Sequence, residues 1–144
     1  MTVARPLLHH AALTVTDLEA SVDWYSQVFS IRPQMDVPHQ GGVGRVLADD
    51  ARTLAIVLHR HEGNGQERFA ETRTGLDHLG LMVADRQELE RWQDHLVEHG
   101  VQRSAEADRP LTQAPIADEP YGSVLTFRDP DNIALELFSP PPAE

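Results

Sequence analysis

The 144-residue sequence contains no cysteine, and all 12 of its basic residues are arginines because lysine is absent as well. The lack of cysteine excludes disulfides, thiolate nucleophiles and thiolate metal ligands. The lack of lysine excludes Schiff-base chemistry through a side-chain amine. Any reaction on this chain must use imidazole, carboxylate or hydroxyl groups, and this donor set suits hard or borderline metal ions.

Positive charge is also scarce, since 23 acidic residues outweigh the 12 arginines and give a net charge of −11. This excess argues against nucleic acid and against anionic membranes as partners. The sequence has no apolar run long enough to cross a bilayer and no signal-peptide pattern at its N-terminus. We therefore expect a cytoplasmic protein, and the length favours one domain spanning residues 1–144.

Two stretches of alternating character, residues 8–17 and 75–85, match each other at a constant offset. The offset aligns four pairs of residues: His10 with His78, Leu13 with Leu81, Val15 with Val83, and Asp17 with Asp85. An internal repeat of this kind predicts two copies of one supersecondary unit. In each copy the aspartate is placed to cap a following helix.

The first copy reads as a strand, a helix and a hairpin. Alternation predicts a strand over residues 7–16, and apolar residues at helical spacing predict a helix over 18–29. Residues 31–42 contain two prolines and end in two glycines, so we interpret them as turn and loop. Strands are predicted over 43–48 and 53–59.

The second copy repeats this order. A strand is predicted over 76–84, followed by a helix that begins after the cap at Asp85 and stops at Gly100. Residues 102–120 are interpreted as a long loop with three prolines. The last two strands are predicted over 123–128 and 133–138.

Alternation also sorts the side chains of the closing strands onto two faces. One face carries bulky rows that should pack on the helices: Leu54, Ile56, Leu58, Ile133, Leu135 and Leu137. The opposite face is small and polar, and it carries His59 and Glu136, with His10 and His78 on the opening strands. A curved sheet with such rows turned inward builds a cleft. Two histidines and one glutamate, from three strands, match a 2-His-1-carboxylate metal site.

These residues carry a resemblance to a known family. The motifs at residues 10–21, 78–85 and 127–137, in this order, resemble the vicinal oxygen chelate superfamily. That superfamily groups glyoxalase I, fosfomycin-resistance transferases, methylmalonyl-CoA epimerase, extradiol dioxygenases and bleomycin-resistance binders. The resemblance implies an α+β fold in which two βαβββ modules form a cupped mixed β-sheet around a metal-binding cleft. It also implies that the chain forms a homodimer.

On this basis we expect module one over residues 7–60, a linker over 61–74, module two over 75–138 and a loose tail over 139–144. The resemblance further implies three metal ligands, His10, His78 and Glu136. The ion would be Ni, Zn, Mn or Fe(II), and the sequence does not decide among them.

The sequence departs from the family where a fourth ligand often stands, because Val57 occupies that position and cannot ligate. Strict glyoxalase I activity is therefore disfavoured, and the fourth position is left to His59, His61 or water. His59 lies one strand step beyond Val57, a distance of roughly 6–7 Å. We predict that it serves as a catalytic general base rather than as a replacement ligand.

Two further departures concern fosfomycin transferases. Ala12 and Thr126 stand where that group usually has threonine and tyrosine, and the chain has no lysine to hold a phosphonate.

We therefore expect a divalent-metal-dependent enzyme acting on a small oxygen-chelating substrate, as a lyase, an isomerase or a ring-cleaving dioxygenase. The alternative is a metal-free drug-binding protein that sequesters an antibiotic, as bleomycin-resistance proteins do. That alternative predicts an aromatic-rich cleft, and only 6% of the residues here are aromatic.

Overall fold

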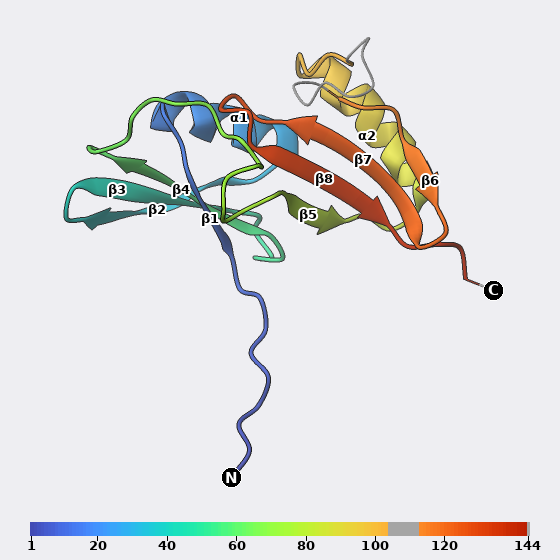
Figure 1. The fold of residues 1–144 in the computed structure, drawn as a ribbon, viewed down its shortest axis with the longest axis horizontal. Helices are drawn as coiled ribbons and strands as arrows, with labels where there is room; N and C mark the ends of the chain where they lie inside the picture. Colours follow the sequence, from blue (N-terminus) through green and yellow to red (C-terminus); the bar gives the residue numbers. More distant parts are fainter. Residues whose placement is uncertain (104–112, 144) are drawn as a thin grey trace. The chain divides into compact units, whose positions relative to one another are not determined.

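The chain forms two compact units, Met1–Gly65 and Gln66–Glu144, in a computed structural model that describes residues 1–103 and 113–143. Each unit holds one helix and one four-stranded sheet (Figure 1). In both units the order is strand, helix, then three strands, so the predicted α+β fold of two βαβββ modules is confirmed. The units divide after Gly65, inside the predicted linker.

Module one contains the following elements: β1 (Ala11–Thr14), α1 (Leu18–Phe29), β2 (Arg32–His39), β3 (Gly42–Ala48) and β4 (Ala55–His61). Its strands lie in the order β1-β4-β3-β2, with β1 parallel to β4 and the other pairs antiparallel. The helix has the predicted bounds. It is capped by Asp17, whose Oδ1 accepts a hydrogen bond of 3.0 Å from the backbone N–H of Ala20.

The prediction of a loop over residues 31–42 was wrong, because most of this stretch forms β2. The two prolines of β2, Pro33 and Pro38, are compatible with a strand because β2 is the edge of its sheet. The register shifts between Pro33 and Met35, where Gln34 donates a side-chain hydrogen bond of 3.3 Å to the carbonyl oxygen of Ala48. An edge strand tolerates the lost donors and the bulge, so proline content alone was a misleading signal.

Module two contains the following elements: β5 (Leu79–Met82), α2 (Arg86–Glu98), β6 (Ala117–Glu119), β7 (Gly122–Arg128) and β8 (Ala134–Ser139). The order β5-β8-β7-β6 and the parallel β5–β8 pair repeat the topology of module one. The predicted loop over 102–120 was wrong where β6 forms at its end, and residues 104–112 lie outside the described residues.

Helix α2 begins and ends where its capping signals predict. The Asp85 carboxylate accepts a 2.8 Å hydrogen bond from the backbone N–H of Glu88, and Gly100 has a φ of +80°. Leu89 and Leu96 of this helix are fully buried, whereas Val97 is 58% exposed. Neither helix in the described ranges has the length and apolar character needed to cross a membrane.

The pairing register supports the internal repeat at the level of single residues. Ala12 pairs with Val57 in the β1–β4 ladder, and Gly80 pairs with Glu136 in the β5–β8 ladder. Val57 and Glu136 therefore occupy equivalent places in the two modules. Helices pack on the bulky rows of both sheets, whose buried members include Ile56, Leu58, Ile133, Leu135 and Leu137.

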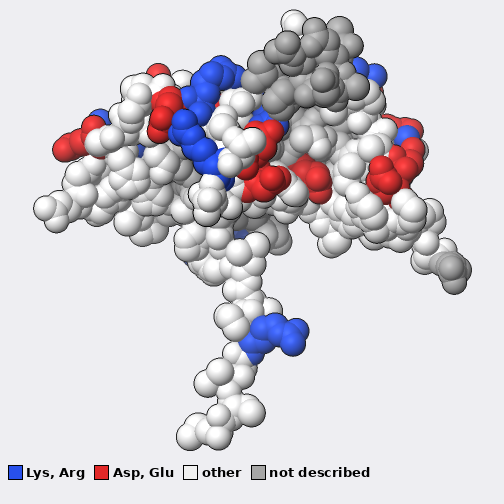
Figure 2. All heavy atoms as spheres, in the orientation of Figure 1, with Lys and Arg blue, Asp and Glu red and all other residues white. Residues whose placement is uncertain are grey.

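Most of the ion pairs join arginines to nearby acidic side chains. Arg45 in β3 contacts Glu19 at 2.8 Å and Asp36 at 2.7 Å, and these hydrogen bonds raise the pKa of its guanidinium. Basic side chains likewise lie beside acidic ones on the face drawn in Figure 2. These pairs neutralise part of the positive charge of a chain whose net charge is −11.

Candidate metal centres

Each module carries polar groups on the sheet face that turns away from its helix. In module two this face includes Gly80, Thr126 and Glu136, whereas Leu135 and Leu137 lie buried on the other side. Met82, two residues after Gly80 in β5, is 77% exposed on the polar side. This face is therefore partly exposed in the described residues, and the cleft expected from the sequence stays a prediction.

His78 and Glu136 meet on this face. The Nε2 atom of His78 lies 3.7 Å from Oε2 of Glu136, and the side chains are 44% and 24% exposed. The other ring nitrogen, Nδ1, lies 2.7 Å from Oδ1 of Asp77. A carboxylate at Nδ1 fixes the proton there and leaves the Nε2 lone pair directed away from Asp77.

This pair fits a divalent metal ion. A separation of 3.7 Å is too long for a hydrogen bond, so the two atoms do not satisfy each other. Two donors bound to one ion at about 2.1 Å lie roughly 3–3.5 Å apart, which a small side-chain adjustment reaches. Gly80 stands opposite Glu136, and even a Cβ there would come no nearer than 3.8 Å to its Oε1. The carboxylate is therefore uncrowded on that side.

The third predicted ligand, His10, belongs to the other module. It precedes β1, is exposed, and has its Nδ1 2.9 Å from Nδ1 of His9. The structure thus brings His78 and Glu136 together within module two, and the part of His10 in their site stays a prediction.

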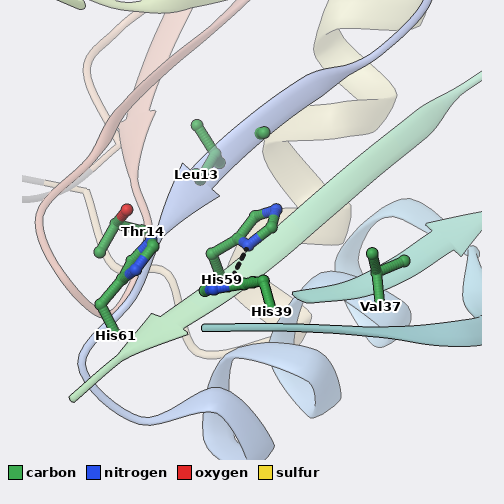
Figure 3. A pocket seen from close by; sticks show the side chains of 7 residues that line it. Leu13, Thr14, Val37, His39, His59 and His61 are labelled. Atoms are coloured by element: carbon green, nitrogen blue, oxygen red, sulfur yellow. Dashed lines mark hydrogen bonds between the residues drawn. The ribbon is translucent and has the colours of Figure 1, made fainter. Parts of the chain in front are cut away.

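Module one presents a second cluster, made of three histidines on its open face (Figure 3). His39 ends β2, and His59 and His61 lie in the last part of β4. His59 Nδ1 is 3.2 Å from His39 Nε2, and one ligating nitrogen from each ring lies within 4.8 Å of the others. They border a pocket of about 480 Å³ whose further lining includes Ala12, Thr14 and Val37.

Burial and neighbouring charge act together on His59. Its pKa is lowered first by burial and then by the nearby imidazoles of His39, His61 and His10. A lowered pKa keeps the ring neutral at neutral pH, so that it can accept a proton or bind a cation. This shift is compatible with the general-base role of His59, which stays a prediction.

Sequence reasoning missed His39, because the stretch holding it was interpreted as a loop. The sequence did contain a signal for this strand. Val37 and His39 keep the alternation of a strand, and the glycines at 42 and 44 would leave space for side chains of a neighbouring strand. His61 was weighed only as a substitute for Val57. The structure instead groups it with His39 and His59.

Comparison with known proteins identifies the fold. The sequence pattern of the Glyoxalase/Bleomycin resistance protein/Dioxygenase superfamily matches residues 7–137. A glyoxylase/bleomycin resistance protein/dioxygenase domain from Frankia sp. EAN1pec is 30% identical, with a TM-score of 0.82 over 98% of this chain and 96% of that one. Among curated proteins no significant relative matches.

More distant structures share the fold. A putative glyoxalase from Bacillus halodurans is 23% identical, with a TM-score of 0.68 over 93% of this chain and 96% of that one. The fosfomycin resistance protein FosX from Listeria monocytogenes, as a point mutant in complex with Mn(II) and 1S,2S-dihydroxypropylphosphonic acid, is 18% identical. Its TM-score is 0.64, over 94% of this chain and 90% of that one.

Proposed function

The chain belongs to the Glyoxalase/Bleomycin resistance protein/Dioxygenase superfamily, and on this premise we propose that it is a divalent-metal-dependent enzyme. Its substrate would be a small molecule that offers two oxygens to the ion. The reaction would be a lyase, isomerase or ring-cleaving dioxygenase reaction, all of which use this type of chelation. The metal ligands would be His10, His78 and Glu136.

The observation that carries this proposal is the approach of His78 to Glu136, with Asp77 on the far ring nitrogen. A histidine oriented by a carboxylate at one nitrogen and facing a second carboxylate at the other is a common arrangement of metal ligands. A nitrogen and an oxygen donor suit Zn, Ni, Mn and Fe(II) alike. The Mn(II) held by the related FosX protein adds support for manganese.

Each residue would have a distinct task. Asp77 orients the His78 ring, and the Glu136 carboxylate balances positive charge. Gly80, which pairs with Glu136, leaves room beside that carboxylate for a substrate. A bound ion would supply Lewis-acid polarisation of the substrate oxygens. His59, neutral because of its lowered pKa, remains the group proposed to accept a proton from the substrate.

Metal analysis of protein purified without chelator tests this function. We expect a divalent ion in the wild type and a rise in melting temperature on addition of Mn, Ni, Zn or Fe(II), because a ligand of the native state alone raises apparent stability. Glu136→Gln should lose Mn(II) binding. Glu98→Gln, an exposed carboxylate at the end of α2, serves as the matched control and should keep it.

Wild-type protein that neither contains nor responds to any of these ions would contradict the proposal. The metal-free drug-binding alternative would then become the better interpretation.

We also propose that the chain functions as a homodimer. The open faces expose large apolar side chains, with Met35 at 60% and Met82 at 77%. Such exposure is unfavourable in water, and a second copy that covers these faces would relieve it.

A further inference from the structure

The three-histidine cluster of module one is separate from the metal ligands proposed above, and the role of base proposed for His59 does not account for His39 and His61 beside it. We propose that His39, His59 and His61 bind a divalent cation of the zinc, nickel and cobalt class. The cation is additional to any ion at His78 and Glu136. This inference rests on module one alone and does not require the proposed function.

The nitrogen atoms already lie near the spacing that one ion requires. Two imidazole nitrogens bound to zinc at about 2.0–2.1 Å are roughly 3.3 Å apart in a tetrahedral site. His59 Nδ1 and His39 Nε2 are 3.2 Å apart. The ligating nitrogen of His61 lies within 4.8 Å of both, and this exposed side chain has room to turn toward them.

The register of the sheet explains how three rings come together. His39 and His61 both pair with Gly42, one from each side of β3. Cα atoms two strands apart are separated by roughly 9–10 Å, yet the centroids of these two rings are 5.0 Å apart. The rings lean over the strand between them because Gly42 has no side chain to hold them apart.

Gly44 leaves equivalent space for the ring of His59. It pairs with His59, and a Cβ built on it would lie 2.6 Å from Cε1 of that ring. A Cβ on Gly42 would likewise lie 2.6 Å from Cε1 of His39. Two glycines of β3 thus lie directly beneath the histidine rings. Because neither has a side chain, this face of the strand leaves the space that the imidazole rings occupy.

The donor set decides which ions fit. Three neutral imidazoles favour zinc, nickel and cobalt, whereas Mg²⁺, Ca²⁺ and Mn²⁺ prefer oxygen ligands. Three protein ligands leave one tetrahedral position for water or a small ligand. The three histidines line the pocket together with Thr14 and Val37, where such a ligand would find space. A nitrogen that binds the ion cannot accept a proton, so the role of base proposed for His59 applies only while the cluster holds no ion.

Without a cation, one N–H···N hydrogen bond can join His39 to His59, so the cluster is tolerated when empty. His61 is exposed, and its substitution should not disturb folding. It is therefore the clean position for a test, while His59 provides a second variant.

Zinc stoichiometry measured on Glu136→Gln protein tests the cluster without interference from the other pair. Chelator-treated protein is loaded with Zn²⁺, desalted and analysed for metal, and each variant is checked by circular dichroism. We expect one zinc ion per chain. His61→Gln in this background should weaken zinc binding by more than the roughly 10–100-fold that loss of an outer-shell partner costs. His59→Gln with His61→Gln should abolish it.

The chain provides a matched control in α2, where His95 and His99 lie with ring centroids 4.2 Å apart. The double variant His95→Gln with His99→Gln removes as many imidazoles and should retain the ion. Mn²⁺ serves as a second probe and should not bind the Glu136→Gln protein.

Three results would overturn the proposal: a Glu136→Gln protein that retains no zinc, zinc that survives loss of His59 and His61, or zinc that disappears with His95 and His99. One further outcome separates the two sites. If zinc binding depends on His59 and His61 while the wild-type protein binds no Mn²⁺, the cluster proposal is supported. The same result would count against His78 and Glu136 as Mn²⁺ ligands, so the two metal sites are tested separately.

Discussion

Arg128 and Glu71 form a bidentate ion pair within module two. Nη1 of Arg128 lies 3.0 Å from Oε2 of Glu71, and Nη2 lies 2.9 Å from Oε1. The arginine side chain is 5% exposed and the glutamate 33%. Nearby, the backbone N–H of Phe69 donates to Asp131 O at 2.9 Å, and Asn132 Nδ2 donates to Phe69 O at 3.0 Å. This part of the predicted linker is therefore fixed to the β7–β8 turn.

We predict that Glu71→Gln lowers the free energy of unfolding by about 2 kcal/mol, because it leaves a buried guanidinium without its counter-charge. Urea denaturation measures the loss. Glu67→Gln is the control, since the Glu67–Arg73 pair is 3.2 Å long and exposed on both sides. Exposed pairs contribute little, so the control should keep wild-type stability. Equal losses in the two variants would contradict the prediction.

The same ion pair predicts a pH dependence. Hydrogen bonds from Arg128 lower the pKa of Glu71 from its ordinary 4.5 to about 2. The unfolded chain therefore takes up this proton before the folded one as pH falls, and the contribution of Glu71, complete above pH 4.5, is lost between 4.5 and about 2. The stability difference between wild type and Glu71→Gln should shrink over this window. A difference that stays constant down to about pH 2 would be inconsistent with it.

Asp77 should act on metal binding through His78. Asp77→Asn removes the negative charge beside Nδ1 of His78. With all proposed ligands retained, this variant should bind Mn(II) about 10–100-fold more weakly than the wild type. Titration calorimetry measures the change. Asp94→Asn, an exposed aspartate on α2, should leave the affinity unchanged. If Asp77→Asn also leaves it unchanged, the orienting role fails.

The glycines of β3 should respond differently to a single methyl group. In Gly42→Ala the new Cβ meets the carbonyl oxygen of Arg60, which cannot move aside, and a loss of about 1–3 kcal/mol is expected. In Gly44→Ala it meets only the His59 ring, which can turn away. That variant should fold well but lose zinc at the three-histidine cluster. Gly63→Ala has open space and should retain both properties.

Thermal unfolding and zinc stoichiometry, measured on all three glycine variants, separate these outcomes. Normal zinc binding by Gly44→Ala would show that His59 does not need its place over β3.

Light scattering at micromolar concentration tests the homodimer. We expect a mass of about twice the 16.1 kDa of one chain. Met82→Glu places a charge on the open face of module two and should shift the protein toward monomers. A monomeric wild type would refute the dimer.

The repeat and both helices were predictable because their signals are local. Asp17 and Asp85 cap helices where the sequence places them. The repeated order of strand, helix and closing strands puts Val57 and Glu136 at equivalent places in the two modules. The approach of His78 to Glu136 was also predictable, since both follow from the alternation of strands in one module.

The three-histidine cluster was not predictable in the same way. His39 and His61 are adjacent only because β2 pairs with β3, and the prolines of β2 concealed that strand. The part proposed for His10, as a ligand with His78 and Glu136, stays a prediction, because no periodicity within one module encodes a relation between residues of two modules. Local sequence patterns thus predicted the helices, most strands and the faces of the sheets. The grouping of side chains from non-adjacent strands could be recognised only once the pairing register of the strands was known.

The edge position of β2 also affects how the purified protein behaves at high concentration. Pro33 and Pro38 lack the N–H groups that an incoming strand would need, and the bulge at Gln34 disturbs the ladder between them. Addition of a further strand along this border of the sheet is therefore disfavoured. The features that hid β2 from sequence interpretation are the ones that protect the molecule from amyloid-like assembly there.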